Sequence, residues 1–182
     1  IYRELNDVAA EKRVLDSLKR VQGSFVEPRS LTFHPQRVEE RLVSFRKQKD
    51  ISGEIWELIQ TGTFYTYEEK NDERALDYLN KALLLSRENN DHSLEASTLL
   101  ALGGFYDDRK HFKESLMYYA QSLIFHRNLS NKGGEALTLR RLSQTYHSMG
   151  QYEALAILLA KQAVNIRQYL RNNIRSLDRE SQ

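Results

Sequence analysis

Apolar residues along most of the chain recur three or four positions apart, which is the spacing of an amphipathic α-helix. One such run contains Leu99, Leu102 and Phe105, and a second follows a polar break at 107–110. The only two prolines are Pro28 and Pro35, so nothing from residue 36 onward blocks a continuous helix. The pattern predicts an all-α protein in which helices are joined by short polar turns.

The helical pattern itself repeats about every 40 residues. Three stretches run from Arg to Glu in eight steps with Asp or Asn midway, at 46–54, 87–95 and 127–135. In each repeat a small residue precedes a tyrosine by three positions: Gly62 and Tyr65, Gly103 and Tyr106, Ser143 and Tyr146. A pair of small residues seven apart follows: Ala75 and Ala82, Ser115 and Ser122, Ala156 and Ala163. Because small residues let two helices approach closely, we expect them at helix–helix contacts.

The order Leu99, Leu102, Gly103, Tyr106, Ser115, Ser122 resembles the tetratricopeptide repeat (TPR), in a form longer than the usual repeat of about 34 residues. The resemblance implies a TPR-type α-solenoid, a right-handed superhelix of antiparallel helix pairs with a concave binding groove. Departures are Ser143 in place of Gly and two serines in place of Ala.

Three repeats are expected over 51–171, at about 51–90, 91–130 and 131–171, with 172–182 extending the last helix. Residues 1–50 are interpreted as an atypical N-terminal helical cap or degenerate repeat, with a loop at 22–36. In this cap, 1–21 is amphipathic. Arg41 occupies a position that is small in the other repeats, so looser packing is expected there.

The TPR resemblance assigns groove-facing positions to the first helix of each repeat. The candidate protein-binding residues are Trp56, Ile59, Thr63, Tyr67, Leu100, Asp107, Asp108, Arg140, Gln144 and His147, with Thr66, Ser97, Gly104, Leu137 and Ser148 at further groove positions. Trp and Tyr most often anchor protein interfaces, which makes Trp56 and Tyr67 the first candidates. Packing of Trp56 against the N-terminal cap is an equal alternative.

The last helix keeps an apolar seam beyond the third repeat, opposite a stripe of arginines. The seam is Ala163, Ile166, Leu170, Ile174 and Leu177, and the stripe is Arg167, Arg171, Arg175 and Arg179. The arginines either lie in water over the seam or form an interface, for an acidic partner or a following domain packed on the Ile166–Leu177 helix. The segment 161–182 resembles the end of the TPR array that precedes the CHAT (caspase-like) peptidase domain in bacterial proteins. That resemblance implies a catalytic His and Cys beyond Gln182.

Composition and charge exclude several classes of function. The chain has no cysteine, which removes thiol nucleophiles and permits a reducing, cytoplasmic location. Its net charge of +2 is too small to predict nucleic-acid binding. No apolar run approaches the length of a membrane-spanning helix, about 20 residues. The histidines have no metal-binding spacing, and the acid pairs Asp107-Asp108 and Glu68-Glu69 are interpreted as solvated turn charges. We therefore expect that the chain is not an enzyme and that it has no cofactor or metal site.

These observations predict a non-catalytic protein–protein interaction module that binds a peptide or protein segment in its groove. The resemblance makes it the sensor or scaffold part of a larger bacterial signalling or peptidase protein. The alternative is a purely structural spacer or oligomerisation scaffold with an empty groove.

Overall fold

The computed structural model describes residues 35–180, with side chains described for 36–174. Over this range the chain is helical and holds no β-strand, so the predicted all-α class is confirmed. The elements are η1 (Pro35–Arg37), α2 (Val38–Gln48), α3 (Ile51–Tyr67), α4 (Asp72–Glu88), α5 (His92–Asp108), α6 (Phe112–Asn128), α7 (Lys132–Met149) and α8 (Glu153–Glu180). The predicted helix at 1–21 and nearly all of the predicted loop at 22–36 lie outside the described residues.

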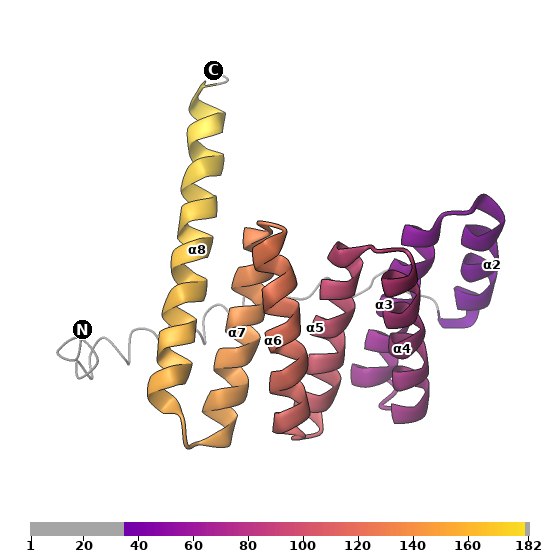
Figure 1. Cartoon of the computed structure of the whole chain (residues 1–182), viewed down its shortest axis with the longest axis horizontal. Coiled ribbons are helices and arrows are strands. Elements are labelled where there is room, and N and C mark those ends of the chain that lie inside the picture. Colours follow the sequence, from indigo (N-terminus) through magenta and orange to yellow (C-terminus); the bar gives the residue numbers. More distant parts are fainter. Residues whose placement is uncertain (1–34, 181–182) are drawn as a thin grey trace. The chain divides into compact units, whose positions relative to one another are not determined.

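The described helices form two compact bodies: the α2–α6 body and the α7–α8 body. In the first, α3 packs against α2, α4 and α5, and α5 packs against both α4 and α6. Successive helices from α3 to α6 run in alternating directions, as Figure 1 shows. Each helix therefore buries its apolar side against its neighbours in sequence.

Two polar contacts establish that α3 and α5 lie side by side and run in the same direction. Near their N-terminal ends, the Ser52 hydroxyl donates to the carboxylate of Asp91 over 3.2 Å. At the other end Arg109, the residue after α5, donates to the backbone carbonyl of Thr66 in α3 over 3.5 Å. The two helices thus form one layer of the α2–α6 body, and α4 and α6 pack against that layer.

Each turn between two described α-helices contains one residue with a left-handed backbone: Lys49, Lys70, Asn90, Lys110, Ser130 and Gly150. In the α2–α3 and α4–α5 turns the following residue is an aspartate, whose N–H donates back into the helix just ended. Asp50 then accepts from the N–H of Gly53 over 2.9 Å, and Asp91 accepts from that of Leu94 over 3.0 Å. A side chain of this kind satisfies one of the free N–H groups at a helix start.

The eight-step Arg-to-Glu spacing of the repeat is a clamp across these turns. Arg46 at the end of α2 donates through Nε to Glu54 of α3 over 2.6 Å, and Arg87 of α4 donates in the same way to Glu95 of α5 over 2.8 Å. The Glu95 side chain is only 8% exposed, so it needs a charged partner. This spacing recurs along the chain, and each ion pair therefore ties the last helix of one repeat to the first helix of the next.

The glycines of the repeat lie at close helix contacts, as predicted. A Cβ atom on Gly62 of α3 would lie 2.6 Å from Cγ of Leu79 in α4, and one on Gly103 of α5 would lie 2.5 Å from Cε1 of Tyr119 in α6. The small residues of the second helices are also buried: Ala75, Ala82, Ser115 and Ser122. Backbone contact at these points sets the separation of the helices.

At Arg41 an ion pair replaces the contact of small residues. Its guanidinium reaches across to α3 and donates to the Glu57 carboxylate over 2.5 Å. Glu57 is 8% exposed and stands where the next repeats have the buried threonines Thr98 and Thr138. A longer side chain on α2 is thus matched by a charged one on α3, and Val38 and Leu42 beside it remain 2% exposed. The small residues of the other repeats are thus replaced at this site by an ion pair.

The α7–α8 body is a helical hairpin. Its core includes Leu139, Ala156 and Ala160, and the Ser143 hydroxyl donates to the carbonyl of Ala156 over 2.7 Å. Helix α8 has 28 residues against 18 in α7, so it runs past its partner, as Figure 1 shows. Ile174, on that extension, is 61% exposed.

Candidate protein-binding face

One side of the α3 and α5 layer is left open within the α2–α6 body, and we call it the inner face. Gly62 and Gly103 mark the sides of the helices turned to α4 and α6. On the opposite side of each helix, residues at helical spacing (three, four or seven positions apart) are exposed or half-buried. They are Trp56, Gln60, Thr63 and Tyr67 on α3, and Ser97, Ala101 and Asp108 on α5. Leu100 and Asp107, both half-buried, lie at its edge.

Trp56 is the largest apolar group on the inner face. It is 52% exposed, one helical turn from the start of α3. Exposed apolar surface costs about 25 cal/mol per Å² relative to burial, so a half-exposed Trp is a favourable contact point for another molecule. Packing of Trp56 against the N-terminal cap stays an alternative, and residues 1–34 of that cap lie outside the described part.

Tyr67 joins the two helices of the inner face at their C-terminal ends. A Cβ atom on Gly104 of α5 would lie 2.5 Å from the Tyr67 hydroxyl oxygen, so a larger residue there would make the end of the Tyr67 side chain shift. The Tyr67 side chain is half-buried and still contributes surface. The two successive glycines therefore have different partners, Gly103 towards α6 and Gly104 towards α3.

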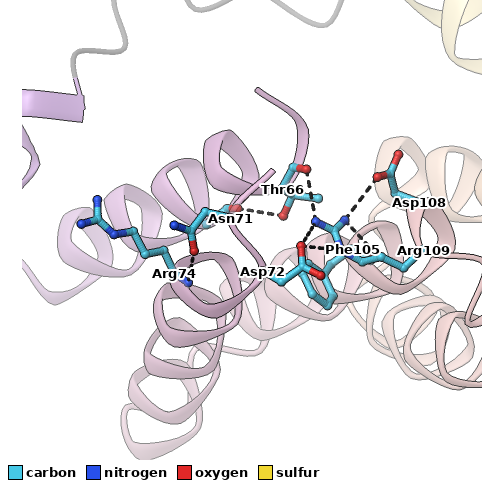
Figure 2. A network of polar contacts seen from close by, with 8 residues as sticks. Thr66, Asn71, Asp72, Arg74, Phe105, Asp108 and Arg109 are labelled. Carbon is cyan, nitrogen blue, oxygen red and sulfur yellow. Dashed lines mark hydrogen bonds and ion pairs between the residues drawn. The ribbon is translucent and has the colours of Figure 1, made fainter. Parts of the chain in front are cut away.

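Arg109 organises the end of this face, as Figure 2 shows. Its Nε atom lies 3.0 Å from the carboxylate of Asp72 at the start of α4, and Nη2 pairs with the same carboxylate. Its Nη1 atom reaches Asp108 over 3.2 Å, and the guanidinium lies 4.1 Å from the centre of the Phe105 ring. With its bond to Thr66, this side chain connects α3, α4 and α5.

The electrostatics of the cluster follow from that geometry. The hydrogen bond from Arg109 holds the pKa of Asp72 below its ordinary value, although partial burial opposes the effect. The same bond raises the pKa of Arg109, which stays charged. The sequence pattern indicates that Asp107 and Asp108 are solvated turn charges. It gives no indication of the role of Arg109, whose side chain is only 17% exposed. An Arg directly after an acidic helix end is the signal that could have found it.

Two candidate positions on these helices are closed. Ile59 is 4% exposed and packs in a cluster with Val38 and Leu42, because α2 covers that side of α3. Thr66 is 1% exposed, and its hydroxyl donates to the Gly62 carbonyl over 2.8 Å. Neither side chain is available to a partner in this arrangement.

The remaining candidates lie in the α7–α8 body. Arg140 is 8% exposed, and Gln144 is half-buried. His147 is exposed, and its Nδ1 lies 2.8 Å from the Glu153 carboxylate at the start of α8. The structure thus brings together the candidates of α3 and α5, and it holds those of α7 in a separate body.

Among the side chains described, at 36–174, no group of three or more His, Asp or Glu is placed to hold a metal ion. No helix in this described range is long and apolar enough to cross a bilayer.

No protein-family model matches the chain, and no curated protein matches it. The chain's own residues and contacts are therefore the basis for inferring its function.

Proposed function

We propose that the chain is a non-catalytic interaction module of the TPR type that binds a peptide or protein segment on its inner face. The observation that carries the proposal is the exposed Trp56 on the same face as Thr63 and Tyr67. Exposed aromatic side chains on a protein surface are typical anchors of protein interfaces.

The repeated contacts support the TPR-type solenoid. The Arg–Glu clamp occurs at two successive repeat boundaries of the α2–α6 body. At both boundaries a residue with a left-handed backbone precedes a capping aspartate. Identical junctions stack repeats in a regular way, and stacked helix pairs expose their first helices on one side. The role of sensor or scaffold in a larger bacterial signalling or peptidase protein rests on the sequence resemblance.

Selection from a library of random dodecapeptides displayed on phage, with the full chain as bait, tests this function. Selected peptides are then measured by fluorescence anisotropy against Trp56→Ala and the matched variant Leu84→Ala. Leu84 is 59% exposed on α4, in the other layer of the body. We expect Trp56→Ala to weaken binding about tenfold or more and Leu84→Ala to leave it unchanged. Peptides that bind both variants like the wild type, or no selected peptide at all, contradict the proposal.

A scaffold function is a second candidate, and the exposed end of α8 favours it. Tyr169 and Ile174 are 60% and 61% exposed there, and such residues on a protruding helix suit contact with a second copy. Light scattering over a concentration series, on the wild type and Ile174→Glu, tests self-association. A wild type that stays monomeric at all concentrations removes this candidate.

A further inference from the structure

We infer that the segment bound by the inner face carries an apolar side chain and, about five residues away, a basic one. The inference rests on the proposed function and specifies its ligand. It starts from the distribution of charge in the α2–α6 body, where the two layers differ sharply.

The two helices that form the inner face carry no cationic side chain, and Arg109, which directly follows α5, is paired with Asp72 and Asp108. Neither α3 nor α5 contains a lysine or an arginine, whereas both α4 and α6 do. Three of the acids on α3 and α5 are neutralised by clamps: Glu54 by Arg46, Glu57 by Arg41, and Glu95 by Arg87. Asp108, in the last turn of α5, lies at one end of the inner face.

Asp108 keeps capacity for a second cation. Its side chain is 45% exposed, and its contact with Arg109 is a single bond of 3.2 Å. Arg109 is committed mainly to Asp72, with which it makes two contacts. The carboxylate of Asp108 therefore presents an acceptor surface to solvent on the same face as Trp56.

The helix ends themselves are already occupied by a cation. Arg109 donates to the carbonyl of Thr66 in α3 over 3.5 Å and to that of Phe105 in α5 over 3.3 Å. Tyr67 and Asp108 stand in the last turns of the two helices. The preference for a lysine or arginine of the bound segment therefore comes from the exposed carboxylate of Asp108.

The spacing follows from helix geometry. Trp56 and Tyr67 are eleven positions apart on α3, which corresponds to about 16 Å along the axis. Asp108 aligns with Tyr67 in the repeat, so the apolar and acidic ends of the face are separated by a similar length. An extended peptide covers that length with about five residues, which sets the interval between its two anchoring side chains.

The test uses the peptides selected on the full chain. Their sequences are scored for Lys and Arg at four to six positions from an aromatic or aliphatic residue, relative to the unselected library. The best peptide is then titrated by anisotropy against Trp56→Ala, Asp108→Asn, Asp108→Lys and the matched variant Glu88→Gln, an exposed acid at the end of α4. Thermal melting by circular dichroism checks that each variant is folded.

We expect basic residues to be enriched, Asp108→Asn to weaken binding by about two- to fivefold, as loss of an exposed ion pair does, and Asp108→Lys to weaken it further. Glu88→Gln should bind like the wild type. The affinity of the wild type should also fall as sodium chloride is raised, a measurement that needs no variant.

The outcomes separate the two hypotheses. Peptides that need Trp56 but show no basic enrichment, no salt dependence, or no loss with Asp108→Asn overturn this inference and leave the proposed function standing. If no selected peptide needs Trp56, the proposed function fails, and the inference fails with it.

Discussion

Two buried serines of α6 provide a matched test of the packing described above. Ser115 and Ser122 are both 0% exposed, seven residues apart, at the small-residue positions of one helix. The Ser122 hydroxyl donates to the carbonyl of Ala96 in α5 over 2.8 Å. The Ser115 hydroxyl oxygen is buried without a hydrogen-bond partner. The same substitution to alanine should therefore have opposite effects at the two sites.

The magnitudes follow from the two environments. A buried hydroxyl without a partner costs about 1–3 kcal/mol, and alanine is the better helix former by about 0.5 kcal/mol. Ser115→Ala should therefore raise the free energy of unfolding by about 1.5 kcal/mol or more. Ser122→Ala gains the same helix propensity but loses a hydrogen bond of about 1 kcal/mol, for a net loss of about 0.5 kcal/mol.

Urea unfolding followed by circular dichroism measures this difference of about 2 kcal/mol, which corresponds to melting temperatures about 5 °C apart for a chain of this size. The comparison is internal, because both variants delete the same oxygen from the same helix. If Ser115→Ala is as destabilising as Ser122→Ala, the interpretation of the Ser115 site as an unsatisfied one is refuted.

Two further stability predictions concern the contacts between helices. Gly103→Ala should destabilise the chain by about 1–3 kcal/mol in urea unfolding despite its better helix propensity, because the new methyl group overlaps the Tyr119 ring; an unchanged midpoint would show that this contact is loose. The pKa of Asp72 is lower in the folded chain than in the unfolded one, so the stability it contributes is present above the unfolded pKa of about 3.9 and is lost as the pH falls through the folded pKa. Asp72→Asn should thus cost under about 1 kcal/mol at pH 7, because the Asp72 side chain is 58% exposed. It should cost nothing at a pH where Asp72 of the wild type is protonated in both the folded and the unfolded chain; a cost that persists in acid contradicts the ion-pair interpretation.

Several contacts at the candidate site cannot be predicted from the local sequence pattern. Transferred groove positions placed Ile59 on the surface, but α2 packs over that side of α3 and buries it. The ion-pair partner of Arg41 is Glu57, sixteen residues away on the next helix, and the local pattern does not indicate it. The partners Asp72 and Thr66 of Arg109 come from the preceding repeat. Each of these features involves a contact between helices that no local pattern records.

The sequence by itself determined the helices, their turns and the repeat, because these depend on contacts within a few residues: apolar spacing, a capping aspartate, and an Arg and Glu eight positions apart. Only the tertiary structure decided which residues of those helices remain open. Exposure depends on the neighbours that cover a side chain. Of two candidates three positions apart on the same helix, the structure leaves Trp56 52% exposed and buries Ile59 to 4%.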